Sequence, residues 1–491
     1  MPVRPYDQNK QFLLPPALNE WLRKDHPARV FSDIIDRLDI SGFQEIKSEG
    51  RPRFDIRMML KVLLWAYANG VRASRKIEEK LHSDVVFMWL AGLEKPDFRT
   101  VCLFRQTNLE RLNYLFSEVI VLAKALGLIR LGLIALDGTK IRANAAVDSF
   151  KKVKDWSEDL TNAQAEVHRI LAEAEAADLA DDKQYGNEFR GDEIPLDLER
   201  VETRIKKIEK LMSRVKTSEK TDDNRVSSTD PEASFMHHKG WSIPAYNAEL
   251  AVTEEQLIVY SDVTTEPVDT NQLVPALEGI KETCGNSPRQ IVADAGFNSG
   301  KNLSALEQYQ VDGYIAEGGE KSLGKTIRRN SDLYSKENFK YDKEQDCYIC
   351  PAGKCLLPAQ QSFHQSKYSQ QEGVIYRTER DVCLTCNKKS QCTQSDNSLG
   401  RSITRTPYET MRMGMREKLK SKEGRLVYKK RKTIVEPVIG QVKMVGGFIQ
   451  FLLRGIIGAK VEWKWATIAH NLLKLTRLIT REKLKLASAV N

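Results

Sequence analysis

The stretch LGLIALDGTKIRANA, Leu131 to Ala145, decides the fold because it reads as a buried strand that ends in an acid. Its apolar run stops at Asp137-Gly138. A short apolar run bounded by a turn dipeptide is typical of a central strand with both faces covered. We therefore expect Asp137 at the carboxyl end of such a strand. For one Asp-Gly motif alone, an ordinary turn cap is the simpler interpretation.

A second stretch has the same design. RQIVADAGFNSG, residues 289–300, is an apolar run that ends at Asp294. Two acids at the carboxyl ends of central strands meet where sheet-based sites collect ligands. Further strands are expected in AYNAELAV, QLIVYSDVTT and GYIAEG, and a helix in NQLVPALEGIKETC. The sequence therefore predicts an α/β core.

The remaining segments differ in character. Residues 1–128 have helical periodicity and scattered arginines, so we expect an all-α domain that either binds DNA or serves for packing. Two apolar stripes with alternating steps of three and four residues predict a coiled-coil-like helical hairpin; a single surface helix is the alternative. A polar, irregular insertion with six of the eight cysteines follows later. We therefore expect four parts. They are the N-terminal helical domain (1–128), a core made of three segments (129–150, 225–325 and 409–480), the hairpin (151–224) and the Cys-rich insertion (326–408).

Positive charge is concentrated near the C-terminus. Residues 401–491 carry 21 Lys and Arg against 6 Asp and Glu, whereas the whole chain of 491 residues has a net charge of +9. A basic segment on an otherwise mildly acidic chain favours a polyanion partner such as nucleic acid, with a Lys-rich solvated surface as the alternative. The N-terminus has no apolar core of the signal-peptide type, and Lys124 and Arg130 interrupt the longest apolar run. We therefore expect a cytoplasmic, nucleoid-associated protein.

One acid stands alone in the basic segment. Glu436 lies in YKKRKTIVEPVIGQVK and is the only Asp or Glu between Glu423 and Glu462. Pro437 predicts that a helix either kinks there or begins near Ile434–Glu436, since proline cannot donate to the carbonyl of residue 433. A surface salt bridge would not explain why other acids are missing on both sides.

A phosphodiester site explains this pattern. Two metal ions, ~3.5–4 Å apart, can activate a hydroxyl and stabilise a leaving oxygen. Such ions need carboxylates, whereas the neighbouring DNA phosphates need Lys and Arg. The sequence therefore predicts that Asp137, Asp294 and Glu436 bind two Mg²⁺ or Mn²⁺ ions.

These motifs resemble the DDE-type transposases of bacterial insertion sequences, in the branch with an N-terminal helical domain and a Cys-rich insertion before the catalytic Glu. The resemblance implies a ribonuclease H-like core, Mg²⁺-dependent cleavage at element ends, strand transfer of the 3′-hydroxyls into target DNA, and a homo-oligomer that pairs two ends. It implies catalytic roles for Asp137, Asp294 and Glu436. The stretches that carry it are YDQNKQFLLPPALNEWLRKDHPARVF, residues 54–105, LDGTKIRANAA, STDPEASFM, YNAELAV, VADAGFNSG and VEPVIGQVK.

The related transposases also have a Tyr, Arg, Glu, Lys signature around the catalytic Glu. Tyr428, Arg431, Glu436 and Lys443 match its order, which implies DNA or phosphate binding by the cations and the tyrosine. Arg431 lies one residue further from the Glu than in the best-known version, and Lys432 occupies the usual position. Which of the two cations holds the phosphate stays open at this point.

The cysteines form two CxxC pairs, at 347/350 and 383/386, with further cysteines at 355 and 392. In a cytoplasmic chain this pattern favours structural zinc over disulfides, with reduced thiols as the alternative. The resemblance implies the ligand set Cys350, Cys383, Cys386 and Cys392.

We therefore expect a DNA transposase. Two other hypotheses remain: a captured transposase that binds DNA as a regulator without catalysis, and a metal-dependent endonuclease that cuts without joining. Three converging carboxylates favour an enzyme, because a regulator that only binds DNA has no use for them.

Overall fold

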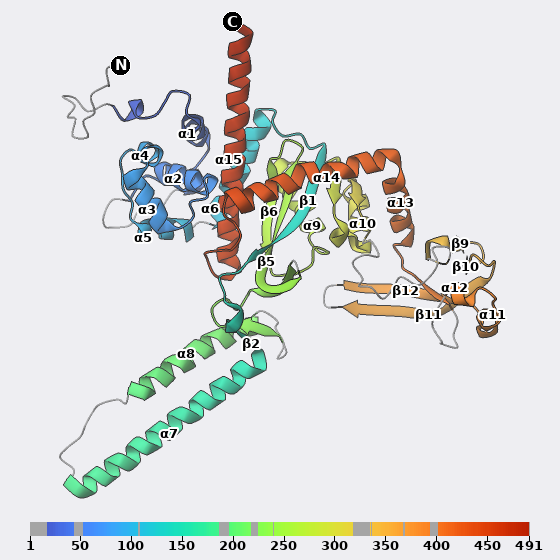
Figure 1. Cartoon of the computed structure of the whole chain (residues 1–491), viewed down its shortest axis with the longest axis horizontal. Helices are drawn as coiled ribbons and strands as arrows, with labels where there is room; N and C mark the ends of the chain where they lie inside the picture. Colours follow the sequence, from blue (N-terminus) through green and yellow to red (C-terminus); the bar gives the residue numbers. More distant parts are fainter. Residues whose placement is uncertain are drawn as a thin grey trace, which may run out of the picture.

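The computed structural model describes residues 17–43, 53–106, 109–185, 196–217, 224–238, 240–317, 334, 336–366, 369–392 and 401–490. It is a mixed α/β structure in which a central sheet is joined to N-terminal helices and to two projecting segments (Figure 1). None of the described helices combines the length and the hydropathy that a membrane span needs.

The N-terminal part is helical, as expected. Its helices are α1 (Pro27–Arg37), α2 (Ile56–Ala68), α3 (Ser74–Ser83), α4 (Val85–Leu90), α5 (Phe98–Gln106) and α6 (Leu109–Ala125). Their apolar faces belong to the same hydrophobic core as the central sheet. The long C-terminal helix α15 (Gly455–Val490) contacts α1, α2, α5 and α6 on one side and strand β6 on another. The helical part is therefore packed onto the sheet through α15.

The central sheet has the strand order β4-β5-β1-β7-β8, and β6 pairs with β5 beyond the end of β4. β1 runs antiparallel to β5 and parallel to β7, and β7 runs parallel to β8. The apolar run at the start of β1 is buried, and β5 is buried from Pro244 to Thr253. The strands are β1 (Leu133–Arg142), β4 (Ser234–His238), β5 (Trp241–Thr253), β6 (Ile258–Thr264), β7 (Gln290–Ala293) and β8 (Asp312–Ile315).

Four helices accompany the sheet. α9 (Leu273–Cys284) contacts β6 and α6, and α10 (Gly300–Gln308) contacts β8. α13 (Glu409–Lys420) leads into α14 (Lys422–Gly440), which crosses the sheet and contacts β1, β5, β7 and β8 (Figure 1). This crossing brings the basic segment of the sequence onto the two strands that carry the predicted acids.

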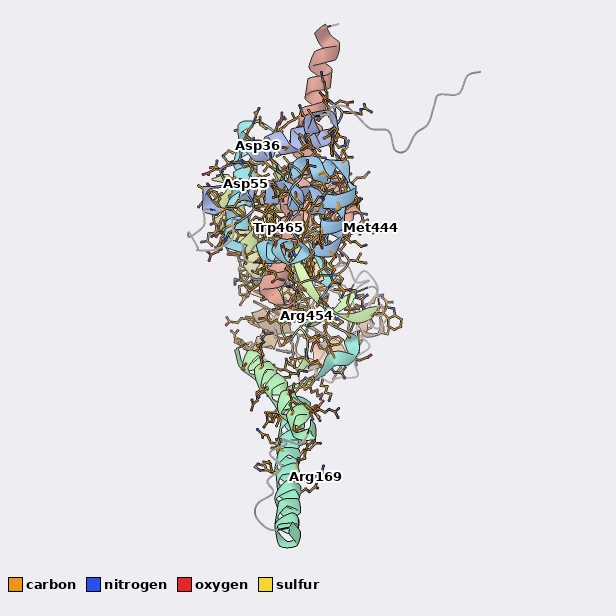
Figure 2. All side chains as sticks on the ribbon, turned by 90° about the vertical axis from the view of Figure 1, so that its left-hand side faces the viewer. Asp36, Asp55, Arg169, Met444, Arg454 and Trp465 are labelled. Atoms are coloured by element: carbon orange, nitrogen blue, oxygen red, sulfur yellow. The ribbon has the colours of Figure 1, made fainter. Side chains whose placement is uncertain are left out.

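The predicted hairpin is present as two long antiparallel helices, α7 (Val153–Tyr185) and α8 (Leu196–Thr217). Figure 2, where Arg169 marks α7, shows them extending away from the body of the molecule. At their base, the short strands β2 (Phe150–Lys152) and β3 (Arg225–Ser227) pair. The apolar stripe predicted for each helix is at least partly buried. The buried positions include Val201, Ile208 and Val215 on α8 and Ala163 on α7.

The expectation of an irregular Cys-rich insertion was wrong. Its described residues form a second antiparallel sheet, in the order β13-β12-β11-β10-β9. The long strands β11 and β12 are rich in Gln and Ser, and exposed positions predominate among those of β11 up to residue 363, so they lack the apolar alternation that identifies a strand in a sequence. The elements are β9 (Lys340–Asp342), β10 (Cys347–Ile349), β11 (Cys355–Ser366), β12 (Ser369–Arg377), α11 (Arg380–Leu384), α12 (Lys389–Cys392) and β13 (Ser402–Arg405).

A buried ion pair joins the N-terminal helices to α15. The Arg72 guanidinium lies 3.3 Å from Glu462 Oε1, with side-chain exposures of 9% and 0%. Arg72 also donates to the carbonyl of Gln450 and lies over the ring of Phe448. Glu462 Oε2 accepts hydrogen bonds from the backbone N–H groups of Leu452 and Leu453. Burial raises the pKa of Glu462, and the Arg72 charge opposes this effect.

The substitution Glu462→Gln is expected to lower the free energy of unfolding by about 3 kcal/mol or more, because it leaves a buried guanidinium without a counter-charge. Urea unfolding followed by tryptophan fluorescence measures this loss. The matched control is Asp262→Asn, which breaks a more exposed pair with Lys460 on the same helix and should change stability little. Equal losses in the two variants would contradict a special role of the buried pair.

Candidate active site

Asp137 and Asp294 lie level with each other on neighbouring parallel strands. The register pairs Leu136 with Ala293, so the next residue on each strand is the predicted acid. Asp294 follows directly after β7 and caps a short 3-10 helix by accepting a hydrogen bond of 2.8 Å from the Gly296 N–H. Asp137, however, does not end its strand, because β1 continues to Arg142 in its pairing with β5. The prediction that the acid ends its strand was therefore wrong for Asp137 in β1, but it was right for Asp294, which comes directly after the last residue of β7.

Glu436 reaches this edge from α14, and Arg431 of the same helix stands between the acids. Arg431 Nη1 donates to Asp137 Oδ2 at 2.8 Å, and Arg431 Nη2 lies 3.7 Å from Glu436 Oε1. The side chains of Arg431 and Asp137 are 15% and 16% exposed, whereas that of Glu436 is 49% exposed. The structure thus brings Asp137 and Glu436 into contact with one guanidinium, and it places Asp294 beside Asp137 where β7 ends.

Helix α14 passes through Pro437, so of the two alternatives that the sequence left open, a helix start near Ile434–Glu436 is excluded. Proline leaves the carbonyl of Thr433 without its usual backbone donor. The side chain of Gln256 supplies the missing hydrogen bond, with Nε2 3.2 Å from the Thr433 oxygen. This contact offsets part of the cost of the internal proline and keeps Glu436 on a continuous helix.

Burial and neighbouring charges shift the pKa values of Asp137 and Asp294. Burial raises the pKa of Asp137 to about 6, the Arg431 charge opposes this effect, and the Asp294 charge adds to it. Burial also raises the pKa of Asp294, while the hydrogen bond from the Gly296 N–H opposes it and the charge of Asp269 adds to it. Carboxylates in this state gain stability from any additional cation.

The signature residues take separate positions. Arg431 faces the acids, whereas Lys432 is exposed. Tyr428 is partly buried, and burial raises its pKa. Lys443 lies beyond α14 in a π-helical turn (Gln441–Val445) and donates to the carbonyl of Lys140 at 2.8 Å. An open cavity of about 460 Å³ beside the acids is lined by Ala316, Glu317, Leu419, Arg425, Tyr428, Lys429, Arg431 and Lys432.

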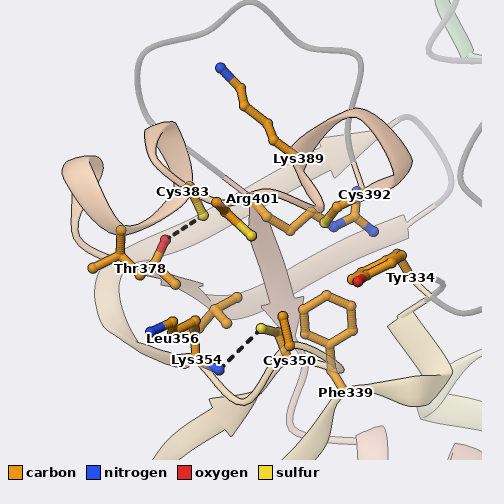
Figure 3. Close-up of a pocket in the computed structure, with 13 residues that line it drawn as sticks. Tyr334, Phe339, Cys350, Lys354, Leu356, Thr378, Cys383, Lys389, Cys392 and Arg401 are labelled. Atoms are coloured by element: carbon orange, nitrogen blue, oxygen red, sulfur yellow. Dashed lines mark hydrogen bonds between the residues drawn. The ribbon is translucent and has the colours of Figure 1, made fainter.

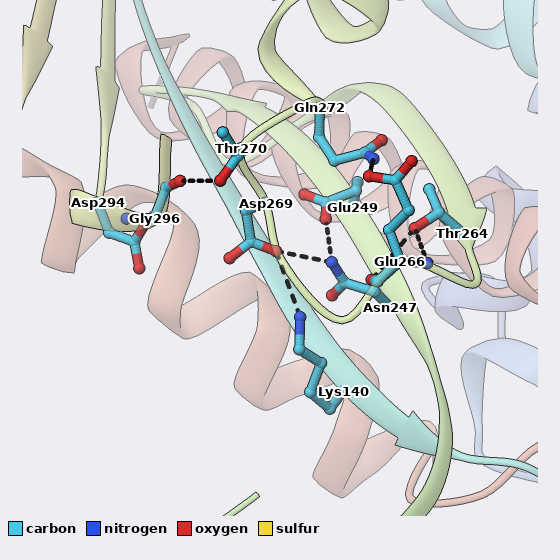
Figure 4. A network of polar contacts seen from close by, with 10 residues as sticks. All are labelled: Lys140, Asn247, Glu249, Thr264, Glu266, Asp269, Thr270, Gln272, Asp294 and Gly296. Atoms are coloured by element: carbon cyan, nitrogen blue, oxygen red, sulfur yellow. Dashed lines mark hydrogen bonds and ion pairs between the residues drawn. The ribbon is translucent and has the colours of Figure 1, made fainter. Parts of the chain in front are cut away.

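A further polar network was missed by the sequence analysis (Figure 4). Asn247 Nδ2 donates to Glu249 Oε1 and to Asp269 Oδ1, both at 2.6 Å, and Lys140 Nζ pairs with the same Asp269 oxygen. The signal was present in AYNAELAV, where Asn247 and Glu249 are polar residues on one face of an otherwise apolar, buried strand.

Among the described residues, no group of three or more His, Cys, Asp or Glu side chains is arranged closely enough to hold a metal ion. The predicted zinc ligands nevertheless share one place. Cys350, Cys383, Cys386 and Cys392 all line a small cavity of about 30 Å³ (Figure 3). Thr378 Oγ1 lies 2.8 Å from Cys383 Sγ, and the Lys354 N–H donates to Cys350 Sγ. Cys347 and Cys355 lie outside this cavity. They are free cysteines whose side chains form a hydrogen bond with each other.

Comparison with known proteins finds two family models that match parts of the chain. Residues 349–476 match the family described as Transposase DDE domain, and residues 16–107 match the family described as Transposase domain (DUF772). The first match contains Glu436 and helix α14, and the second covers most of the N-terminal helices. No curated protein matches the chain. These two matches, each to less than half of the chain, support a DDE-type insertion-sequence transposase.

The raised pKa of Asp137 predicts a pH dependence of stability in the metal-free protein. Its folded value of about 6 exceeds the ordinary value of 3.8, so the native state holds the proton more tightly than the unfolded state. Stability relative to Asp137→Asn should therefore fall as the pH rises, by about 2 kcal/mol between pH ~4.5 and ~7. Urea unfolding of both proteins in EDTA at the two pH values measures this difference; an unchanged difference would contradict the assignment.

Proposed function

We propose that the chain is a DNA transposase that cleaves DNA at insertion-sequence ends and transfers the exposed 3′-hydroxyls into target DNA. The observation that carries this proposal is the placement of Asp137 and Glu436 on either side of Arg431, with Asp294 next to Asp137 at the end of β7. The strand order, with β1 between antiparallel β5 and parallel β7, supports a ribonuclease H-like core. DNA transposition in general follows from the family; the cleavage and joining steps are our proposal.

The donor set suits Mg²⁺ or Mn²⁺, because carboxylate oxygens are the ligands that these hard cations prefer. Burial, and to a lesser extent the charges of neighbouring acids, raises the pKa values of Asp137 and Asp294 even with Arg431 in place, so a bound cation would stabilise their charged forms. Asp137, Asp294 and Glu436 would hold two ions, which supply activation of the attacking hydroxyl and stabilisation of the leaving oxygen.

The protein's own residues position the DNA. Arg431 lies next to the carboxylates and carries a planar pair of donors that suits a phosphate group. Lys432 and Lys429 line the neighbouring cavity, so they extend positive charge away from the acids along α14. Lys443 lies near β1 through its contact with the carbonyl of Lys140. We propose that these cations and Tyr428 bind the DNA backbone beside the reacting phosphate.

The proposed transposition reaction also bears on the oligomeric state and the cellular location of the protein. Strand transfer of two element ends requires two active sites, so we propose a homo-oligomer on DNA in the cytoplasm, associated with the nucleoid. The basic C-terminal segment, which includes α14, supports binding to this polyanion.

The substitution Glu436→Gln tests the catalytic proposal. It keeps the size of the side chain but weakens metal ligation, so the variant should bind a labelled duplex carrying the element's end and lose cleavage by a factor of about 100 or more. Cleavage with Mg²⁺ and DNA binding by gel shift are measured for both proteins, with Glu423→Gln as a control on the same helix. Equal cleavage by wild type and Glu436→Gln would place the third carboxylate elsewhere.

The same assay separates the alternatives. If wild type binds the element's end and does not cut it, the protein is a DNA-binding regulator. If it cuts but does not join precut ends to a target plasmid, it is an endonuclease without strand transfer.

We also propose a structural zinc site formed by Cys350, Cys383, Cys386 and Cys392, because four thiols around one small cavity are the donor set that zinc prefers. Purified protein should contain zinc in equal amount to the chain, as measured by mass spectrometry. Cys386→Ser should lose it, whereas Cys355→Ser, which changes an exposed cysteine outside the cavity, should keep it. Absence of zinc from wild type, or equal zinc in both variants, would contradict this site.

A further inference from the structure

Asp269 is a carboxylate beside the catalytic acids that belongs to none of the motifs. It lies in the loop between β6 and α9, and its side chain is 18% exposed. Oδ1 accepts a hydrogen bond of 2.6 Å from Asn247 Nδ2 and lies 3.3 Å from Lys140 Nζ. Because both partners stand on central strands, the orientation of this carboxylate is fixed by the sheet and not by its loop.

The second oxygen of Asp269 faces the catalytic centre. A Cβ atom placed on Gly296 would lie 3.0 Å from Asp269 Oδ2 and 3.0 Å from Asp294 Oδ1. The two oxygens therefore border the same small space, on either side of the glycine. The charge of Asp269 also acts on Asp137 and Asp294, since it contributes to the raised pKa of each.

Asp269 also lies close to a glycine on β1, Gly138. A Cβ atom there would lie 2.8 Å from Asp269 Oδ1 and 2.7 Å from Glu249 Oε1, closer than real contacts allow. Gly138 and Gly296 follow Asp137 and Asp294 in the sequence, so both Asp motifs carry a glycine where Asp269 approaches. The space over these glycines is thus kept free of side chains.

An unsatisfied buried group points into the same region. Glu249 has no exposed surface, and its Oε2 has no hydrogen-bond partner among the described residues. This oxygen lies 3.0 Å from the Cβ position of Gly138. A buried carboxylate oxygen without a donor is costly, and it is stabilised when a proton or a cation lies nearby.

From this geometry we infer that Asp269 is a fourth carboxylate of the active site, a positioning residue for the divalent cation that Asp137 and Asp294 would hold. The inference rests on the proposed function, since it presupposes that these two acids bind a divalent ion. Partners of this kind orient the ligands of a metal, and their loss typically weakens metal binding about 10–100-fold.

The test is the binding of Mn²⁺, measured directly by the electron paramagnetic resonance signal of the free ion without DNA or catalysis. Asp269→Asn should bind Mn²⁺ at least about ten-fold more weakly than wild type. Cleavage by this variant should need a correspondingly higher Mn²⁺ concentration and should recover most of its rate at saturation. The matched control is Glu266→Gln, which changes a carboxylate in the same loop. Glu266 accepts hydrogen bonds from Asn271 and from Gln272, the second of which is drawn in Figure 4.

The outcomes separate this inference from the proposed function. If wild type binds Mn²⁺, Asp137→Asn does not, and Asp269→Asn binds like Glu266→Gln, the role of Asp269 is overturned while the proposed metal site stands. If wild type binds no Mn²⁺, both fall. A purely structural role would lower the melting temperature of Asp269→Asn without moving its half-saturating Mn²⁺ concentration. Should this variant fail to fold, Asp269→Ser serves in the same titration, with the same expected loss.

Discussion

The ion pair between Arg431 and Asp137 is the contact on which the arrangement of the site depends. It joins residues 294 positions apart in the sequence, at 2.8 Å, and both side chains are largely buried. Asp137 stands on the central strand next to Asp294, so burial alone would leave two unpaired acids in a poorly solvated region. The guanidinium supplies the opposite charge, and in doing so it sets helix α14 across the sheet with Glu436 on the same side.

Two further contacts hold this helix and its neighbours in place. Gln256 satisfies the carbonyl of Thr433 that Pro437 leaves without a donor, so α14 continues past the proline. The buried pair of Arg72 and Glu462 joins the N-terminal helices to α15, and α15 in turn packs on β6. The helical part, the sheet and helix α14 also share one hydrophobic core.

Much of this was predictable from local patterns. The apolar runs before Asp137 and Asp294 identified β1 and β7, because a buried strand must be apolar on both faces. The isolation of Glu436 among cations identified the third acid. The sheet of the Cys-rich insertion was not predictable in the same way, since the Gln- and Ser-rich strands β11 and β12 carry no apolar alternation. Whether the helix continues through Pro437 or begins beside it was left open by the sequence, because it depends on a donor from a residue far away in the chain.

The sequence by itself therefore determined which residues are candidates for the chemistry: three acids, the cations around one of them and a set of cysteines. Only the tertiary structure decided that Arg431 rather than Lys432 faces the acids, and that Asp269 and Glu249 lie beside them. The physical reason is that a residue's type and its neighbours in the chain fix its charge and its local conformation. Its counter-charges and hydrogen-bond donors come from other elements, and they are known only when those elements have packed together.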